Sequence, residues 1–302
     1  MKILLTGANG LIGQKIKQKL LTNPAMQLIA TSRSNEINPL KKDYTFEQLD
    51  ITYPEQIHQC VDDHRPEVII HTAAQANVNY CEQNKEDCYA VNTEAVRTLV
   101  RVSNHFNIHL IHFSTDFIYD GKQPPYQEND LPNPVNYYGQ SKVKAESILR
   151  EHSNQYTILR PILVYGYFKG MKRNNLVTWV LKSLAKQQPI KVVNDQYRCP
   201  TLAEDIAWLT SEIARRKQTG VFHICGEESV SMYELARRTA VSFQLDTQLI
   251  SPITSRELNE IAPRPAKTCF FLQKSKKVFD YQPTDLNQGL KIIQQQYTKN
   301  IH

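Results

Sequence analysis

The chain begins with the stretch MKILLTGANGLIG, residues 1–13. Its apolar run Ile3–Leu5 predicts a short buried strand. A helical pattern starts at Leu11 and places Ile16 and Leu20 on one face. Three glycines, Gly7, Gly10 and Gly13, lie between the strand and the first helical turn. The stretch therefore predicts a strand, a tight glycine turn and a helix.

This order of elements is typical of the first half of a dinucleotide-binding unit. Glycine suits a turn whose backbone must come close to a pyrophosphate. The N–H groups at the helix N-terminus favour that anion. The spacing is G-x-x-G-x-x-G, and a purely structural turn is the alternative. The position between a strand and a helix favours phosphate binding.

The bulk composition favours a soluble enzyme. The 302 residues allow one large or two modest domains, and no run has the length of a membrane span. The N-terminus lacks the pattern of a signal peptide, so we expect a cytoplasmic protein without membrane contact. The net charge of +6, from 36 basic and 30 acidic residues, suits a polyanionic small ligand. Without a long basic block, nucleic acid is not an expected partner.

The cysteines predict neither a disulfide framework nor a zinc site. The six residues contain no C-x-x-C pair, and we expect them to be reduced thiols. They are Cys60, Cys81, Cys88, Cys199, Cys225 and Cys269. No His, Asp or Glu cluster has ligand spacing, so no structural metal is predicted. Mg²⁺ bound to a substrate diphosphate stays open.

The end of the second predicted strand, Leu28–Thr31, bears on the choice of cofactor. An acidic residue there binds the ribose 2′-hydroxyl of NAD, whereas an arginine accommodates the 2′-phosphate of NADP. Arg33 stands between Ser32 and Ser34, which favours NADPH. Glu36 keeps NADH open, and Arg33 as a solvated loop residue is the alternative.

The next strands end in residues that suit a bound dinucleotide. Asp50 follows the predicted strand Phe46–Leu49, where its carboxylate could accept from an adenine amino group or cap the helix near Pro54. The small residues at 72–74 follow the buried strand Val68–His71 and leave room for a cofactor. A single long helix is then expected over 86–105, with Asn92 as a polar surface position.

A second group of polar residues follows the strand Ile108–Phe113. Hydroxyls at Ser114 and Thr115 lie where parallel sheets bind ligands. Tyr138 and Lys142 stand at i and i+4 in a predicted helix, so they share one face. This pair is the favoured catalytic pair. A second pair, Tyr165 and Lys169, falls in a loop, and Tyr165 is at best a residue on the substrate side.

The second half of the chain changes character. Residues 172–175 mix basic and amide side chains, which suits a diphosphate or a helix start. Arg264 lies between two prolines in a rigid turn that could hold its guanidinium toward a phosphate. We expect a cofactor domain over 1–165, to which 199–225 returns, and a smaller substrate domain from 166–198 and 226–302.

Several motifs in this order resemble the extended short-chain dehydrogenase/reductase superfamily, and within it the dTDP-4-dehydrorhamnose reductase family. They are Gly7-x-x-Gly10-x-x-Gly13, the stretch STDFIYDG at 114–121, Tyr138-x-x-x-Lys142, Asn194-Asp195-Gln196-Tyr197 with Pro200-Thr201, and Arg264-Pro265. The resemblance covers nearly the whole chain. It implies an α/β fold with a doubly wound Rossmann-type parallel sheet and a smaller C-terminal substrate domain. It also implies NAD(P)H-dependent reduction of the 4-keto group of a nucleotide-linked deoxysugar.

The resemblance also assigns site residues. Catalytic places fall on Thr115, Tyr138 and Lys142. Cofactor places fall on Gly7, Gly10, Leu11, Ile12, Gly13, Arg33, Asp50, Ile51, Ala73 and Ala74, together with Tyr138 and Lys142. Substrate places fall on Asp116, Asn175, Arg198 and Arg264. Two departures concern the substrate: Leu163 stands where relatives often have tryptophan, and 266–271 lack the usual polar stretch.

Two other functions stay open. A 4-epimerase of the same fold would retain its cofactor through turnover. A dehydratase is disfavoured, because only Asp116 follows the strand-end threonine where dehydratases have an acidic pair. A non-catalytic NADP-binding regulatory subunit, like the methionine adenosyltransferase β subunit, is the alternative from another class. A homodimer is also open.

Overall fold

The computed structural model describes residues 1–40 and 43–299. Its centre is a seven-stranded sheet in the order β3-β2-β1-β4-β5-β6-β11, and all neighbouring strands are parallel. The strands are β1 (Lys2–Thr6), β2 (Gln27–Ser32), β3 (Thr45–Gln48), β4 (Val68–His71), β5 (His109–Phe113), β6 (Tyr156–Pro161) and β11 (Gly220–Ile224). This order is that of a doubly wound Rossmann sheet and confirms the expected fold class.

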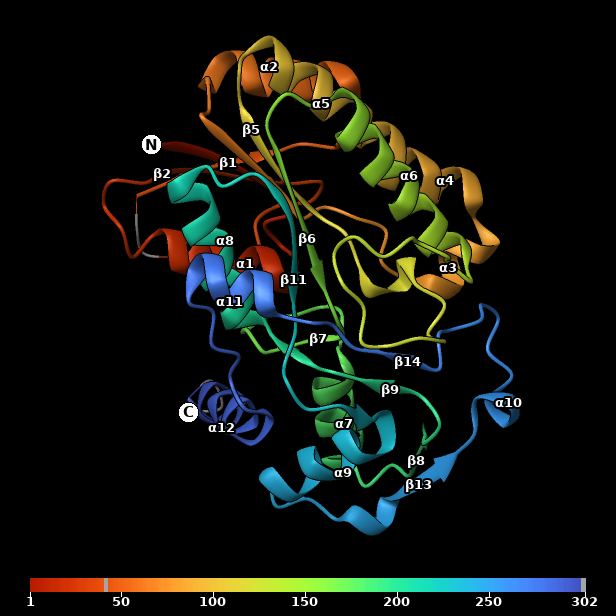
Figure 1. Cartoon of the computed structure of the whole chain (residues 1–302). Coiled ribbons are helices and arrows are strands. Elements are labelled where there is room, and N and C mark those ends of the chain that lie inside the picture. The colour runs from red at the N-terminus through yellow and green to blue at the C-terminus, as the bar shows by residue number, and fades with distance from the viewer. Residues whose placement is uncertain (41–42, 300–302) are drawn as a thin grey trace.

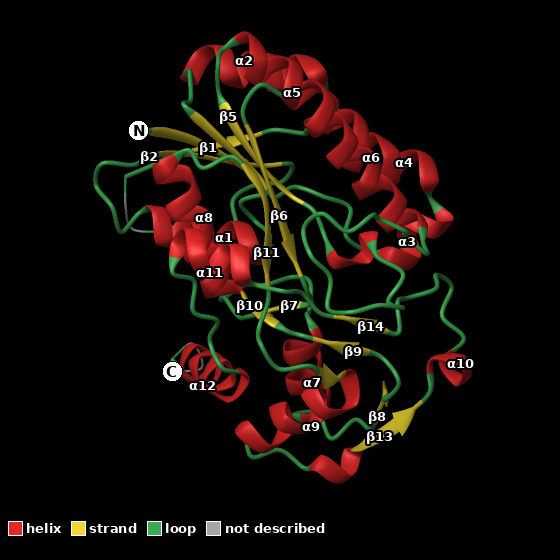
Figure 2. Cartoon of the chain, in the orientation of Figure 1, coloured by secondary structure: helices red, strands yellow, loops and turns green. Residues whose placement is uncertain are grey.

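Helices cover both faces of the sheet, as Figures 1 and 2 show. One face carries α2 (Pro54–His64), α5 (Ala95–His105) and α6 (Tyr137–His152). The other carries α1 (Leu11–Leu20), α8 (Ala203–Arg216) and α11 (Gln273–Phe279). Because both faces are covered, the central strands β4 and β5 are buried along their whole length and are mostly apolar. No helix among the described residues is both long and apolar enough to span a bilayer.

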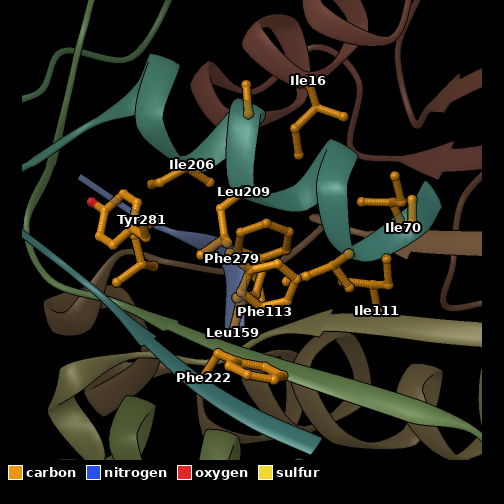
Figure 3. Close-up of a cluster of buried hydrophobic side chains, with 14 of the residues drawn as sticks. Ile16, Ile70, Ile111, Phe113, Leu159, Ile206, Leu209, Phe222, Phe279 and Tyr281 are labelled. Atoms are coloured by element: carbon orange, nitrogen blue, oxygen red, sulfur yellow. The ribbon is translucent and has the colours of Figure 1, made fainter. Parts of the chain in front are cut away.

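The larger core lies between the sheet and α1, α8 and α11 (Figure 3). Ile16 and Leu209 from the helices meet Ile111 and Phe222 from the strands, and all four side chains are fully buried or nearly so. Burying a side chain of this size stabilises the fold by about 1.5–3 kcal/mol. The core therefore fixes the sheet whose strand ends carry the polar residues.

The remaining elements gather below the carboxyl ends of the strands, at the lower end of Figure 1. Their helices are α7 (Leu176–Leu184), α9 (Met232–Ser242), α10 (Ser255–Leu258) and α12 (Leu286–Thr298). Their strands are β7 (Val164–Tyr165), β8 (Ile190–Val193), β9 (Tyr197–Arg198), β10 (Thr201–Leu202), β12 (Val230–Ser231), β13 (Ile250–Ile253) and β14 (Lys267–Thr268). These strands form a β10-β7 pair, a β13-β8 pair and a β12-β9-β14 sheet.

The expected helix over 86–105 is confirmed as one helical segment, but it contains a π-helical turn: α4 (Lys85–Tyr89) continues through the turn over Ala90–Glu94 into α5. The short helix α3 (Val78–Gln83) precedes this segment. Asn92 is not at the surface but buried, and its side chain bonds the backbone of Gln75 in the loop after β4. This side chain thus lies between the loop after β4 and α6, where it also donates to the Ser141 hydroxyl, and π-turns of this kind are frequent at functional sites.

The expectation of six reduced thiols is also wrong. Cys199 and Cys269 form a disulfide, with Cα atoms 5.5 Å apart. The two residues follow β9 and β14, which pair in parallel with Arg198 opposite Thr268. This register brings together cysteines that are 70 residues apart in the sequence. Cys60, Cys81, Cys88 and Cys225 are free and buried.

Candidate active site

A cavity of about 800 Å³ opens at the carboxyl ends of the sheet strands. It lies at the point where the strand order reverses between β1 and β4, which is where such sheets bind ligands. Every site residue expected from the sequence lines it: Gly7, Gly10, Leu11, Ile12, Gly13, Arg33, Asp50, Ile51, Ala73, Ala74, Thr115, Asp116, Tyr138, Lys142, Asn175, Arg198 and Arg264. The structure thus brings all of them to one site, while their individual roles stay predictions.

The glycine turn after β1 fits a dinucleotide pyrophosphate. Gly7 has a φ of +73°, and a Cβ there would lie 2.6 Å from the backbone nitrogen of Ala73. A Cβ at Gly13 would overlap the carbonyl oxygen of Gly7. Gly10 caps α1 without a side-chain bond, so the N–H groups of the first turn are left for a ligand. The turn therefore offers backbone donors at the surface of the cavity.

The loop after β2 exposes Arg33 at the cavity, whereas the Glu36 side chain does not line it. Arg33 is exposed on the cavity wall. Asn9 fixes this loop because its amide nitrogen donates to the carbonyl oxygen of Asn35, at 2.9 Å, and its amide oxygen accepts from the Ile37 nitrogen. The Glu36 carboxylate accepts from Lys17 at 2.8 Å and from the Tyr44 hydroxyl. Glu36, the residue that kept NADH open, thus has its carboxylate engaged elsewhere.

Asp50 does not cap α2, since Tyr53 occupies that position. One carboxylate oxygen of Asp50 accepts from both the backbone nitrogen and the hydroxyl of Thr52, at 3.0 and 2.8 Å. Its side chain forms a local turn at the cavity edge, and the second carboxylate oxygen has no bond of this kind among the described residues. The geometry favours a role in contacting a ligand over the capping alternative.

Thr115 lies at the end of β5, in extended backbone. Its hydroxyl accepts from the Phe117 nitrogen and donates to a carboxylate oxygen of Asp116, both at 3.2 Å. The Tyr138 side chain lies close enough to the same threonine for the Thr115 hydroxyl to lower the pKa of the phenol. Two hydroxyls from different elements therefore converge on one wall of the cavity.

Tyr138 is held by the start of α6. Asn136 caps this helix, accepting from the Gly139 nitrogen at 2.8 Å and donating to the Pro263 carbonyl at 2.9 Å. Gly139 packs against the Phe117 carbonyl so closely that a Cβ would overlap it. Burial raises the pKa of Tyr138 above its usual value, and the bond to Thr115 acts in the opposite direction. Without a ligand, Tyr138 is a protonated phenol.

Lys142 follows one helical turn later and is also buried. Burial lowers the pKa of its ammonium group to about 8, while the Glu146 carboxylate raises it. Within the described residues its hydrogen-bond partner is the His112 Nε2, 3.5 Å from Lys142 Nζ. The lysine can therefore hold or release its proton near neutral pH.

The residues expected to contact substrate are already engaged with one another. Asp116 pairs with Arg198, 3.6 Å from its Nε, and accepts from the Thr268 hydroxyl at 2.5 Å. Burial raises the pKa of Asp116, and Arg198 opposes that shift. The Arg198 guanidinium also donates to the carbonyls of Tyr197 and Pro265, each at 2.7 Å. This cluster fixes the position of the residue after Thr115.

Arg264 and Asn175 reach the cavity from two further segments. Arg264 forms an ion pair with Glu260 at 2.5 Å. Asn175 caps α7: its amide oxygen accepts from the Thr178 nitrogen, and its amide nitrogen donates to the Gly166 carbonyl. Both polar atoms of the Asn175 side chain are therefore engaged within the protein, which agrees with the alternative that this residue starts a helix.

Asn92, which the sequence analysis placed at the surface, supports this site although it does not line the cavity. Its amide bonds both the nitrogen and the carbonyl of Gln75, at 2.9 and 3.0 Å, and donates to the Ser141 hydroxyl at 3.1 Å. It thus joins the loop on the cavity wall to α6, next to Lys142. An asparagine inside an apolar helical stretch was the available signal, because such a residue needs polar partners when buried.

Two other groups lie outside the cavity lining. Tyr165, of the second Tyr-x-x-x-Lys pair, is buried in an apolar cluster with Leu290, so it is a core residue. Glu47, Cys60 and His64 bring three possible metal ligands together, a group that the sequence spacing did not reveal. In this structure the His64 Nε2 and a Glu47 carboxylate oxygen lie 2.6 Å apart, and burial raises the pKa of Cys60 to about 12.

A Rossmann sheet with a strand-end threonine facing a helical tyrosine and lysine is the architecture of the extended short-chain dehydrogenases and reductases. Within that class, the chain belongs to the family described as the RmlD substrate binding domain, whose model matches residues 1–299. It is 30% identical to a dTDP-4-dehydrorhamnose reductase of Aggregatibacter actinomycetemcomitans, over 97% of this chain and 98% of that protein.

Other relatives carry different names. The chain is 27% identical to the methionine adenosyltransferase 2 subunit beta of Bos taurus, over 84% of this chain and 75% of the relative. Among solved structures, dTDP-4-dehydrorhamnose reductase from Bacillus anthracis in complex with NADP superposes with a TM-score of 0.84 at 26% identity, covering 97% and 98% of the two chains. A Thermotoga maritima UDP-glucose 4-epimerase with UDP-glucose has a TM-score of 0.87 at 22% identity and full coverage, and supports the fold alone.

Proposed function

We propose that this protein is an NAD(P)H-dependent reductase of the 4-keto group of a nucleotide-linked deoxysugar, of the dTDP-4-dehydrorhamnose reductase type. The observation that carries the proposal is the convergence of the Thr115 and Tyr138 hydroxyls on one cavity wall, with Lys142 one turn further along α6. Residues 1–165 form the cofactor half of the site, and the later segments that reach the cavity form the sugar half.

NADPH is the favoured cofactor. The glycine turn and the N-terminus of α1 would hold its pyrophosphate, and Arg33 would hold the 2′-phosphate. The engagement of Glu36 with Lys17 supports NADPH over NADH, because the acidic residue does not compete for the ribose hydroxyls. When bound, the reduced nicotinamide supplies the hydride that goes to carbon 4 of the sugar.

Tyr138 is the general acid. Its phenol is protonated in the buried site, and it donates that proton to the alkoxide oxygen that develops on the former keto group. Thr115 donates a hydrogen bond to the same oxygen and orients the carbonyl. A positive charge on Lys142 favours the phenolate that remains and brings the pKa of Tyr138 down toward the working pH.

Arg198 and Arg264 supply the positive charge on the substrate side of the cavity. Arginine suits a diphosphate because its planar guanidinium donates two parallel hydrogen bonds. Asp116 acts on the sugar side mainly by fixing Arg198 and the chain after Thr115. Asn175 shapes the cavity edge through the start of α7.

The test is oxidation of NADPH and NADH, followed at the nicotinamide absorbance, with dTDP-4-keto-6-deoxy-L-mannose as substrate. We expect turnover that is faster with NADPH. Tyr138→Phe should lower kcat by roughly 10²-fold or more, the usual scale for a lost general acid, and leave NADPH affinity nearly unchanged. Tyr137→Phe, the neighbouring tyrosine on α6, is the matched control and should keep full activity. Activity that survives in Tyr138→Phe refutes the assigned role.

A regulatory role is the second candidate, because the similarity to methionine adenosyltransferase β subunits extends over 84% of this chain. The same assay separates the two functions. Saturable NADPH binding without turnover of any 4-keto nucleotide sugar favours the regulatory role. Turnover that depends on Tyr138 favours the reductase.

A further inference from the structure

A row of buried polar side chains crosses three neighbouring strands beneath the catalytic helix. The parallel register places Thr6 of β1 beside His71 of β4, and His71 beside His112 of β5. The Thr6 hydroxyl and the His71 Nδ1 are 2.7 Å apart, and the His71 and His112 rings stack with centroids 5.4 Å apart. The row ends at Lys142, whose Nζ lies 3.5 Å from the His112 Nε2.

Packing alone does not explain these residues. All four are at most 2% exposed and lie between the sheet and α6. The His71 Nε2 and the His112 Nδ1 have no hydrogen-bond partner in the described structure. A buried polar group without its partner is costly, and valine or leucine would fill a strand position of this kind without that cost.

We propose that His112 is a positioning residue for Lys142: its Nε2 accepts a hydrogen bond from the ammonium group, and Thr6 and His71 hold the imidazole in place. This inference rests on the proposed role of Lys142 in the reductase. A lysine ammonium has only donors, so the bond requires the His112 lone pair at Nε2 and its proton at Nδ1. Burial, with Lys142 and His71, holds the pKa of His112 well below its usual range, which keeps this acceptor available.

The other groups around Lys142 do not replace this acceptor. Glu146, one turn along α6, is bound to Arg160 through two hydrogen bonds at 2.9 and 2.6 Å. Tyr138 lies one turn before on the same helix, and the thiols of Cys81 and Cys88 approach from α3 and α4. His112 is therefore the neutral acceptor that can fix the ammonium position before a cofactor binds.

The effect of the bond is to favour the charged form of Lys142. Loss of a hydrogen bond to a charged donor lowers its pKa by about one to two units. The distance of 3.5 Å is near the outer limit of hydrogen bonding, so we expect a shift of about one unit in His112→Phe. Starting from a pKa of about 8, the protonated fraction of Lys142 at pH 8 falls from about one half to about one tenth.

The experiment measures the Lys142 pKa in the unliganded protein by trace acetylation with acetic anhydride across pH 6–10, with mass-spectrometric readout. His112→Phe keeps a ring against His71 but removes the acceptor, and His112→Leu replaces it if the first variant does not fold. His112→Gln returns an acceptor to the Nε2 position and should restore the wild-type curve. His109→Phe, a buried histidine on the opposite face of the same strand, is the matched control.

The falling limb of kcat/KM at high pH, measured with NADPH, should move to lower pH in His112→Phe by the same amount and return in His112→Gln. An unchanged acetylation curve in a folded His112→Phe overturns the inference, as does an equal shift in His109→Phe or a failure of His112→Gln to restore the curve. The acetylation result does not depend on activity. A shifted curve in a protein without reductase turnover keeps the positioning role and removes the proposed function.

Discussion

Four buried histidines should make this protein unusually sensitive to mild acid. His71, His109, His112 and His223 are each at most 1% exposed. Burial lowers the pKa of His71 to about 3 and that of His109 to about 4, and holds those of His112 and His223 well below the usual value. In the unfolded chain all four take up a proton near pH 6.5.

The direction and size of the effect follow from proton binding. Below pH 6.5 the unfolded state binds protons that the folded state does not, so the free energy of unfolding falls as the pH falls. Between pH 7.5 and 5.5 each histidine costs about 1.4 kcal/mol, and the four together about 5 to 6 kcal/mol. Domains typically have about 5–15 kcal/mol of stability, so much of it should be gone at pH 5.5. Lys142, whose folded-state pKa is about 8, stays mostly protonated in both states over this range, so its contribution is small.

Urea unfolding at pH 7.5 and 5.5, followed by the fluorescence of Trp179 and Trp208, measures the difference. His109→Gln is the internal test, because glutamine can still donate to the Thr157 hydroxyl but does not titrate. This variant should lose about 1.4 kcal/mol less than the wild type over the same pH interval. A wild-type loss below about 2 kcal/mol, or an equal loss in His109→Gln, would refute the reasoning.

Two further predictions concern single contacts. Gly139→Ala forces a Cβ into the Phe117 carbonyl, so α6 must move relative to Thr115, and kcat/KM should fall by about 10²-fold. The control is Gly289→Ala in α12, whose new Cβ crowds Tyr165 of β7; it should lower the melting temperature but change kcat/KM less. Reduction of the Cys199–Cys269 disulfide opens a 70-residue loop and should lower the free energy of unfolding by up to about 4 kcal/mol. Thiol titration in denaturant should find four reactive groups before reduction and six after it, and six before reduction would contradict the disulfide.

The cofactor half of the site could be predicted from the sequence because its parts are local. The cofactor residues between Gly7 and Ala74 follow sheet strands closely, and parallel strands end at one edge whatever their order. At Gly7 and Gly13 other backbone atoms come too close for a Cβ, and the glycine residue type alone indicates such a close approach. The i, i+4 spacing of Tyr138 and Lys142 predicts, from the sequence alone, that both side chains lie on one face of a helix.

The features that the sequence did not predict depend on contacts between segments that are distant in the chain. The disulfide follows from the pairing of β9 with β14, and both strands have only two residues, too few for a periodic pattern. The π-helical turn at Asn92 depends on the Gln75 backbone, which no helical periodicity can report. The engagement of Glu36 by Lys17 and Tyr44 is likewise a tertiary contact, and it supports the proposed preference for NADPH, which the sequence left open.

The substrate half of the cavity differs from the cofactor half in its charge balance. The glycine turn after β1 offers backbone N–H groups, and the first turn of α1 has no acidic residue that would compete for them. Arg198 and Arg264 instead face Asp116 and Glu260, so their charges are already balanced by carboxylates. A diphosphate must therefore share or displace those carboxylates, and its binding depends on the placement of the two guanidinium groups more than on net charge. Because Asp116 directly follows Thr115, we expect diphosphate binding at Arg198 to affect the position of the Thr115 hydroxyl, which orients the sugar carbonyl in the proposed mechanism.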